Sequence, residues 1–159
     1  MATKKMTRAD YVRLIEKKYL ASVMKDDYAT IRDCFTEDAR ATIYHGDNPV
    51  QVFFKNPKGR QQSFDTFYGH LFANYTTNFG TIHTVVDGDK GTAATTYFGH
   101  RLTVKKGSPY KKAGNMRLNN ANFFWFRGGK IADMIIYYAN PTFGKKMGLK
   151  PRMPTAFPK

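Results

Sequence analysis

Cysteine and acidic residues are scarce in this chain of 159 residues. Its single cysteine, Cys34, excludes an internal disulfide and a metal site built from several thiolates. Only 12 acidic residues stand against 26 lysines and arginines, so the formal net charge is +14 at pH 7. Such a charge attracts polyanions. A nucleic-acid partner therefore stays open as an alternative, but it is not favoured, because no aromatic-basic recognition motif accompanies the basic clusters.

Long hydrophobic runs are also missing. No stretch reaches the roughly eighteen apolar residues of a membrane helix, and residues 1–8 carry charges where a signal peptide is apolar. We therefore expect a cytoplasmic protein with no membrane span. The sequence also lacks a phosphate-binding glycine loop, a nucleophile elbow and a recognisable spacing of metal ligands. We expect neither a cofactor nor a metal.

Aromatic residues, in contrast, are plentiful, with 13 Phe and 10 Tyr. Together with a hydrophobic content of 42%, they exclude a disordered chain and predict a core rich in large rings. The chain has the length of one ordinary domain, and its basic residues gather toward both ends and in one loop. We predict a basic N-terminal arm at residues 1–8, one domain over residues 9–140 and a basic tail at residues 141–159.

Helical periodicity dominates the first half of the chain. Apolar residues recur there at every third or fourth position, which predicts helices over residues 7–23, 27–35 and 63–75. Thr7 and Asp10 have the spacing of a capping box at the start of the first helix. The helices therefore precede most of the strands.

Alternation with period two replaces the helical pattern from residue 81 onward. It predicts strands at residues 81–87, 92–104, 116–127 and 130–138. Glycine-rich turns between these strands indicate antiparallel hairpins. A shorter strand begins at Ala39, and an extended piece covers residues 50–54. Helices followed by a meander predict an α+β fold.

Two segments, YLASVMKDDYATIRDCFTEDA and NFFWFRGGKIADM, resemble the NTF2-like superfamily. Within it they are most similar to the SnoaL-like group, which includes ketosteroid isomerase and scytalone dehydratase. The resemblance covers roughly residues 9–140. It implies a cystatin-like cone, in which three N-terminal helices pack on a curved, mostly antiparallel sheet and enclose a pocket. Because this scaffold hosts isomerases, dehydratases, cyclases and binding modules, the fold alone does not decide the activity.

Two polar residues match the oxyanion-binding positions of the family. Tyr19 stands eight residues before Asp27, as the oxyanion-hole tyrosine of ketosteroid isomerase stands before its acidic residue. Asn122 takes the place of the second donor. The catalytic aspartate of the isomerase would fall near residues 43–45, where this chain has no carboxylate. The tyrosine-aspartate pair of the dehydratase would fall at residues 23–24, which are Val and Met. The resemblance therefore favours neither of these two activities.

The residues themselves leave two readings of the polar positions open. Strand alternation places Asn120 and Asn122 on one face with Phe124 and Phe126. A buried amide without partners costs about 1–3 kcal/mol, so these amides either pair inside the core or bind a ligand. The same choice applies to Tyr19, whose ring packs in the core or whose hydroxyl binds a ligand oxygen.

Three histidines are candidates for a proton-transferring base, because histidine alone titrates near neutral pH without perturbation. His45 is favoured over His83 and His100, since it lies nearest to the base position of the family. The alternative for His45 is an exposed loop histidine without a role.

The leading hypothesis is a cofactor-independent isomerase, cyclase or dehydratase that moves a proton on a small hydrophobic carbonyl compound. Tyr19 and Asn122 would bind the carbonyl oxygen, as in an oxyanion hole. The alternative is a binding module without turnover. The resemblance also implies a homodimer formed through the outer face of the sheet, where Phe123 and Trp125 would be exposed. The predicted apolar wall of the pocket consists of Phe64, Phe67, Phe124 and Phe126.

Overall fold

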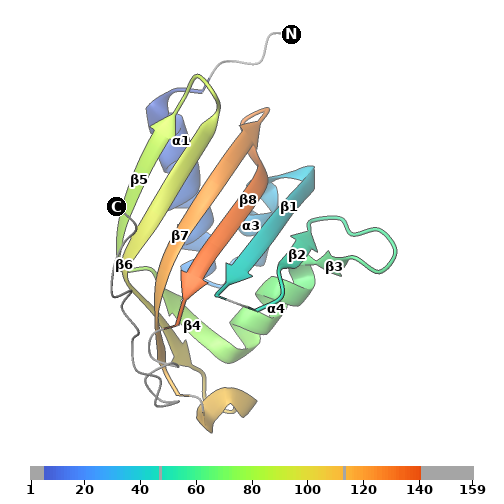
Figure 1. Ribbon diagram of the computed structural model, residues 1–159, viewed down its shortest axis with the longest axis vertical. Helices are drawn as coiled ribbons and strands as arrows, with labels where there is room; N and C mark the ends of the chain where they lie inside the picture. Colours follow the sequence, from blue (N-terminus) through green and yellow to red (C-terminus); the bar gives the residue numbers. More distant parts are fainter. Residues whose placement is uncertain (1–5, 47, 113, 141–159) are drawn as a thin grey trace, which may run out of the picture.

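The computed structural model describes residues 6–46, 48–112 and 114–140. Its architecture is α+β, with a large curved sheet that does not close on itself and with helices α1 and α3 behind the sheet in the view of Figure 1. The predicted fold class is therefore confirmed. The predicted basic tail and most of the predicted basic arm lie outside the described residues.

The first helix runs through three segments without a break, α1 (Arg8–Val12), the π-helix η1 (Arg13–Leu20) and α2 (Ala21–Met24). The predicted capping box is present. The backbone N–H of Asp10 donates to the Thr7 hydroxyl at 3.2 Å, and the backbone N–H of Thr7 donates to the Asp10 carboxylate at 2.9 Å. These bonds satisfy donors that a helix start otherwise leaves without partners.

The second predicted helix is shorter than its sequence pattern. Helix α3 (Tyr28–Asp33) begins after Asp27, whose carboxylate accepts a hydrogen bond from the backbone of Thr30 at 3.1 Å. The predicted end of this helix is wrong, because Phe35 is already the first residue of strand β1 (Phe35–His45). That residue pairs in parallel with Ile131, and this long-range pairing overrides the local helical period.

The middle of the chain contains short elements around one helix. They are β2 (Gln51–Phe54), β3 (Gln62–Ser63), α4 (Phe64–Asn74) and β4 (Tyr75–Asn78). The predicted extended piece and the predicted helix are confirmed. Strand β4 was not predicted. Its first residue, Tyr75, changes directly from the helix to extended dihedrals of φ −136° and ψ 148°, so no loop marks the boundary.

The four long strands of the second half are confirmed. They are β5 (Thr81–Asp87), β6 (Thr92–Val104), β7 (Met116–Arg127) and β8 (Lys130–Ala139). A short 3-10 helix, η2 (Pro109–Lys112), lies between β6 and β7. The strand order of the sheet is β3-β2-β1-β8-β7-β6-β4, with β5 beside β6. Most neighbours are antiparallel, and β1 with β8 and β2 with β3 are parallel.

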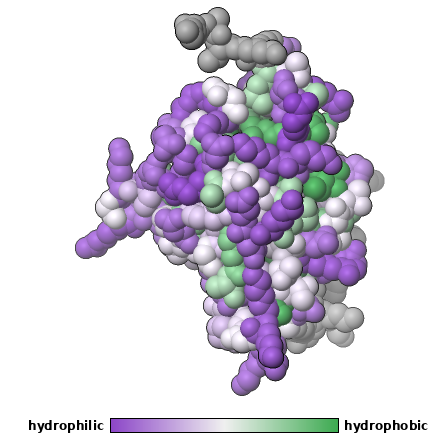
Figure 2. All heavy atoms as spheres, turned by 180° about the vertical axis from the view of Figure 1, so that it is seen from behind, coloured by the Kyte–Doolittle hydropathy of each residue, from purple (hydrophilic) through white to green (hydrophobic). Residues whose placement is uncertain are grey.

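The core lies between the helices and the inner face of the sheet. Phe35, Phe64 and Phe124 have no exposed surface, and helix residues such as Ile15 and Leu20 cover them. From behind, hydrophilic side chains cover most of the surface, with small hydrophobic patches between them (Figure 2). None of the helices in the described ranges is both long and apolar enough to span a membrane.

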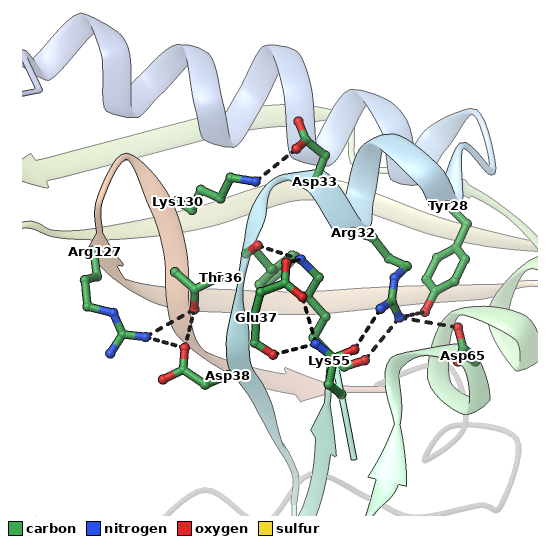
Figure 3. A network of polar contacts seen from close by, with 12 residues as sticks. Tyr28, Arg32, Asp33, Thr36, Glu37, Asp38, Lys55, Asp65, Arg127 and Lys130 are labelled. Carbon is green, nitrogen blue, oxygen red and sulfur yellow. Dashed lines mark hydrogen bonds and ion pairs between the residues drawn. The ribbon is translucent and has the colours of Figure 1, made fainter. Parts of the chain in front are cut away.

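A polar network joins α3 to β1, to the bend that follows β2 and to α4 (Figure 3). Lys55 is buried, and its ammonium donates to the Phe35 carbonyl at 3.0 Å and to the Glu37 carboxylate at 2.6 Å. Arg32 donates to the Lys55 carbonyl at 3.1 Å and lies 3.7 Å from the carboxylate of Asp65. A buried ammonium needs such partners. The network therefore fixes the start of β1, where its register with β8 shifts.

Candidate functional site

A cavity of about 270 Å³ lies between the sheet and the helices. Strands β1, β4, β6, β7 and β8 supply one wall, and the first helix and α4 supply the other. Val23, Phe67 and Leu71 make the helical wall largely apolar, whereas the sheet wall carries amide and imidazole side chains. The cavity is therefore suited to a small apolar molecule with a few polar groups.

Six of the residues singled out from the sequence line this cavity. They come from the first helix, β1, α4, β6 and β7, so only the folded sheet brings them together. These six are Tyr19, His45, Phe67, His100, Asn120 and Asn122.

The other four predicted site residues lie elsewhere. His83 is exposed on the outer side of the sheet, where its ring meets that of Phe98 at 5.2 Å. The alternation of β5 turns the neighbours of His83 inward and His83 outward. Phe64 and Phe124 are fully buried in the core, and Phe126 packs at its edge. None of the four lines the cavity, and none has a part in the site described below.

Two buried tyrosines meet at the cavity. The hydroxyl groups of Tyr19 and Tyr68 are 3.0 Å apart. Burial raises the pKa of Tyr19 well above its ordinary value, and the neighbouring Tyr68 raises it further. Burial also raises the pKa of Tyr68. Both phenols therefore stay protonated. One hydroxyl donates to the other, and the remaining hydroxyl hydrogen of the pair can donate a hydrogen bond to a ligand oxygen.

Asn122 lines the same cavity from the sheet wall. Its side chain is 3% exposed, and its amide oxygen has no hydrogen-bond partner among the described residues. Thr95 stands opposite Asn122 in the β6–β7 ladder. Burial raises the pKa of Tyr97, and the nearby side chains of Thr95 and Asn122 lower it in part. The Tyr97 hydroxyl nevertheless has no hydrogen bond of ordinary geometry to a described residue. Buried polar groups without partners indicate a place for a ligand or water.

A bulge in β6 turns His100 into the cavity. Tyr97 faces inward, and simple alternation would then turn His100 outward. The β6–β7 register instead shifts between these two residues, where Gly99 has a φ of 83°. The extra residue reverses the facing, so that His100 is buried as well.

Asn120 sets the protonation of His100. The imidazole Nδ1 lies 3.0 Å from the Asn120 side-chain oxygen. An oxygen accepts, so Nδ1 carries the hydrogen and Nε2 carries the lone pair. Nε2 is buried and makes no hydrogen bond to the described part of the chain. Burial lowers the pKa of His100, and the bond to Asn120 opposes part of this shift. The ring is thus a neutral base with a free acceptor nitrogen.

His45 has the opposite arrangement. The Asn48 amide nitrogen lies 2.8 Å from the His45 carbonyl oxygen, to which it donates, and 3.1 Å from Nδ1 of the ring. Nδ1 is then an acceptor, which leaves the hydrogen of the neutral ring on Nε2. The ring also stacks on Tyr138 at 4.2 Å. In one cavity, His100 presents an acceptor and His45 a donor.

Many residues of the wall were not found from the sequence, among them three from α4 and β4. His70 of α4 and Tyr75 and Thr77 of β4 line the cavity. His70 stands one helical turn after Phe67, a spacing that could have revealed it. The Thr-Thr pair at residues 76–77 is typical of a strand, but the helical pattern masked it.

Metal-ligating side chains do not gather here. In residues 6–46, 48–112 and 114–140, no three His, Cys, Asp or Glu side chains are grouped so that they could hold a metal ion.

Known families and structures match both the sequence and the fold. The SnoaL-like domain profile matches residues 17–134. A comparison with curated proteins found no match.

Three solved structures illustrate the likeness in fold. A candidate polyketide cyclase from Xanthomonas campestris pv. campestris has a TM-score of 0.62 at 16% identity, over 82% of this chain and 91% of that one. A candidate isomerase from Bacillus subtilis has a TM-score of 0.60 at 14% identity, over 89% and 95%. An NTF2-like protein from Burkholderia xenovorans LB400 has a TM-score of 0.63 at 10% identity, over 88% and 97%. The predicted NTF2-like fold is confirmed.

Proposed function

Because the chain belongs to the SnoaL-like family, we propose that it is an enzyme that moves a proton on a small hydrophobic carbonyl compound. Isomerases, cyclases and dehydratases of this kind need no cofactor. One observation carries the proposal. His100 presents a buried, unprotonated Nε2 without a partner in the described chain, in the same cavity as the Tyr19–Tyr68 pair and Asn122.

The first step removes a proton from the carbon next to the carbonyl. The ligand oxygen accepts hydrogen bonds from the phenol pair and from the side-chain nitrogen, Nδ2, of Asn122, which polarises the carbonyl. Nε2 of His100 takes the proton, and the electrons of the broken C–H bond move through the new C=C bond onto oxygen. Neutral donors in a buried cavity then stabilise the enolate, at about 3 kcal/mol for one well-placed donor.

The second step returns a proton. The imidazolium of His100 gives its proton back to the substrate and becomes neutral again, while Nε2 of His45 donates only a hydrogen bond to a second polar group of the ligand. Return to a different carbon, in an enolate that is conjugated with a C=C bond, is an isomerisation. Attack of the enolate carbon on a second carbonyl of the same molecule closes a ring, and the imidazolium then protonates the new alkoxide. The names of the Bacillus and Xanthomonas neighbours, an isomerase and a polyketide cyclase, support this class of reaction and a substrate that contains ketones.

Deuterium uptake tests the proposal without knowledge of the natural substrate. We would follow exchange next to the carbonyl of 4-phenyl-2-butanone in D₂O by NMR. The protein should accelerate the exchange, and Tyr19→Phe combined with Asn122→Ala should slow the catalysed rate by about 10²–10³-fold, as the loss of oxyanion donors does elsewhere. An unchanged rate in the double variant would show that these groups do not stabilise the enolate.

A binding module without turnover is the second candidate. No aspartate or glutamate is found among the described residues that line the cavity, so the carboxylate base of ketosteroid isomerase has no counterpart here. Under this alternative the ketone would bind, but the wild-type protein would leave its exchange rate at the buffer value.

We also propose a homodimer formed through the outer face of the sheet. Phe98, Phe123, Trp125 and Tyr137 are exposed there, at 38–63% of their surface. Apolar surface of this kind on one face is characteristic of interaction sites. A second copy would remove these rings from water.

A further inference from the structure

We propose that the ligand of this cavity is a hydroxyketone, with a hydroxyl group remote from its carbonyl that binds to Thr77. The inference rests on the proposed function, because the Tyr19 end of the cavity is taken as the carbonyl site. It assigns to Thr77 the role of a specificity-determining residue.

Thr77 is a buried hydroxyl that lacks a partner. Its side chain lines the cavity and is 4% exposed, and no described residue forms a hydrogen bond with its Oγ1. An unsatisfied buried hydroxyl costs about 1–3 kcal/mol, and valine would fill the same space without that cost. A ligand hydroxyl explains why a polar side chain occupies this position.

The unpartnered groups of the wall form a row. On β7, the next inward-facing residue from Asn122 toward the β4 end of the cavity is Asn120, about 7 Å along the strand. The side-chain oxygen of Asn120 accepts a hydrogen bond from His100. On β6, Leu102 is the next inward residue after His100, and Thr77 of β4 pairs with it. The order along the wall is therefore Asn122, His100, Thr77.

This order matches the parts of an elongated hydroxyketone. Its carbonyl oxygen would lie at Asn122 and the phenols, the carbon that loses the proton at His100, and the hydroxyl at Thr77. Between these points the walls are apolar, with Phe67 and Leu71 on the helical side. A ring or a short chain would join the two oxygen functions.

A matched pair of ketones tests the inference by affinity. We would measure the dissociation constants of 4-phenyl-2-butanone and 4-(4-hydroxyphenyl)-2-butanone, which differ by one hydroxyl. The wild type should bind the hydroxyketone about tenfold more tightly, the upper end for one net hydrogen bond. Thr77→Val should abolish this preference and keep the affinity for the parent ketone, while Thr77→Ser should retain it. Thr76→Val, on the exposed side of the same strand, is the control that should change nothing.

Each other outcome bears on one claim. Equal binding of the two ketones to the wild type, or an equal preference in wild type and Thr77→Val, would overturn the role of Thr77. Failure of both ketones to bind would overturn it as well. Selective binding without deuterium uptake would overturn the proposed catalysis but support the hydroxyl site at Thr77. Deuterium uptake without selective binding would support the catalysis and overturn the hydroxyl site. Unfolding of Thr77→Val in urea provides the folding check, since removal of an unpaired hydroxyl should leave stability equal or higher.

Discussion

The charge state of His100 depends on where its side chain lies. Burial removes water from the imidazole and lowers its pKa below the usual 6.5. Above pH 6.5 the ring is neutral in both the folded and the unfolded chain. Below that value the unfolded chain binds a proton that the folded chain resists, so the free energy of unfolding falls.

A pH series of unfolding experiments tests this shift. We expect the wild type to lose stability as the pH falls below about 6.5, by about 1.4 kcal/mol for each unit of lowering of the pKa. The variant His100→Gln lacks this titration and should lose less over the same range. Parallel pH profiles of wild type and variant would contradict a lowered pKa. Nitrogen-15 NMR of the imidazole should also find the hydrogen on Nδ1.

The phenol pair supports a second prediction at the scale of single residues. Tyr68→Phe keeps the ring and leaves the Tyr19 hydroxyl without the partner that lies at 3.0 Å. We expect a loss of about 1–2 kcal/mol in the free energy of unfolding and slower deuterium uptake. Urea denaturation with a parallel rate measurement checks both effects. Unchanged stability and rate would mean that the two hydroxyls do not act together.

Part of the site could be predicted from single residues. Tyr19 and Asn122 matched family positions, and both line the cavity. The sequence favoured His45 over His100 as the base. Spacing alone does not reveal that Asn120 binds Nδ1 of His100, or that Asn48 donates to Nδ1 of His45. Tyr68 lies in the helix predicted over residues 63–75, but its partner, Tyr19, is 49 residues away, so no local pattern reveals the pair.

At the scale of elements, the bulge in β6 determines which side chains face the cavity. The period-two pattern predicted the strand, yet alternation carried through Gly99 would have turned His100 to the outer face. Bulges depend on pairing with neighbouring strands, so one strand pattern does not show them. Strand β4 was missed for a related reason, because the helix before it passes into the strand without a turn signal.

Two glycines near this bulge provide a matched pair of variants. Gly80 and Gly99 both have positive φ, of 65° and 83°. A methyl group at Gly99 meets no atom within 4 Å, whereas one at Gly80 would lie 2.2 Å from the Phe98 carbonyl oxygen. Gly99→Ala should therefore cost only the strain of the left-handed conformation, about 1–2 kcal/mol.

Gly80→Ala should cost clearly more than Gly99→Ala, because backbone atoms of β6 must also move. Thermal or urea unfolding of the two variants ranks them. If Gly99→Ala were less stable than Gly80→Ala, the result would contradict the close approach of Gly80, which follows β4, to the backbone of β6 at the bulge.

At the scale of the whole molecule, the outer face of the sheet predicts the oligomeric state. We expect a dimer by light scattering, and we expect Trp125→Glu to yield monomers, because it places a charge in an apolar interface. Tyr110→Glu is the control, since Tyr110 has the same exposure of 41% but lies on η2. A wild-type monomer, or equal dissociation by both variants, would contradict the proposed interface.

The net charge of +14 predicts contact with nucleic acid that depends on charge alone. Binding that depends on charge alone declines steeply with salt. We expect any complex with DNA or RNA to be lost at about 0.2 M salt, as measured by fluorescence anisotropy. A complex that survives this salt concentration would promote the nucleic-acid alternative.

The most direct test of the proposed chemistry compares histidine variants in one assay. Deuterium uptake by 4-phenyl-2-butanone would be measured for the wild type, His100→Gln and His83→Gln. The base role predicts that the catalysed rate falls by about 10²–10⁴-fold in His100→Gln and stays at the wild-type level in His83→Gln, whose side chain is on the outer face. A His100→Gln protein that remains folded and exchanges at the wild-type rate would contradict His100 as the base.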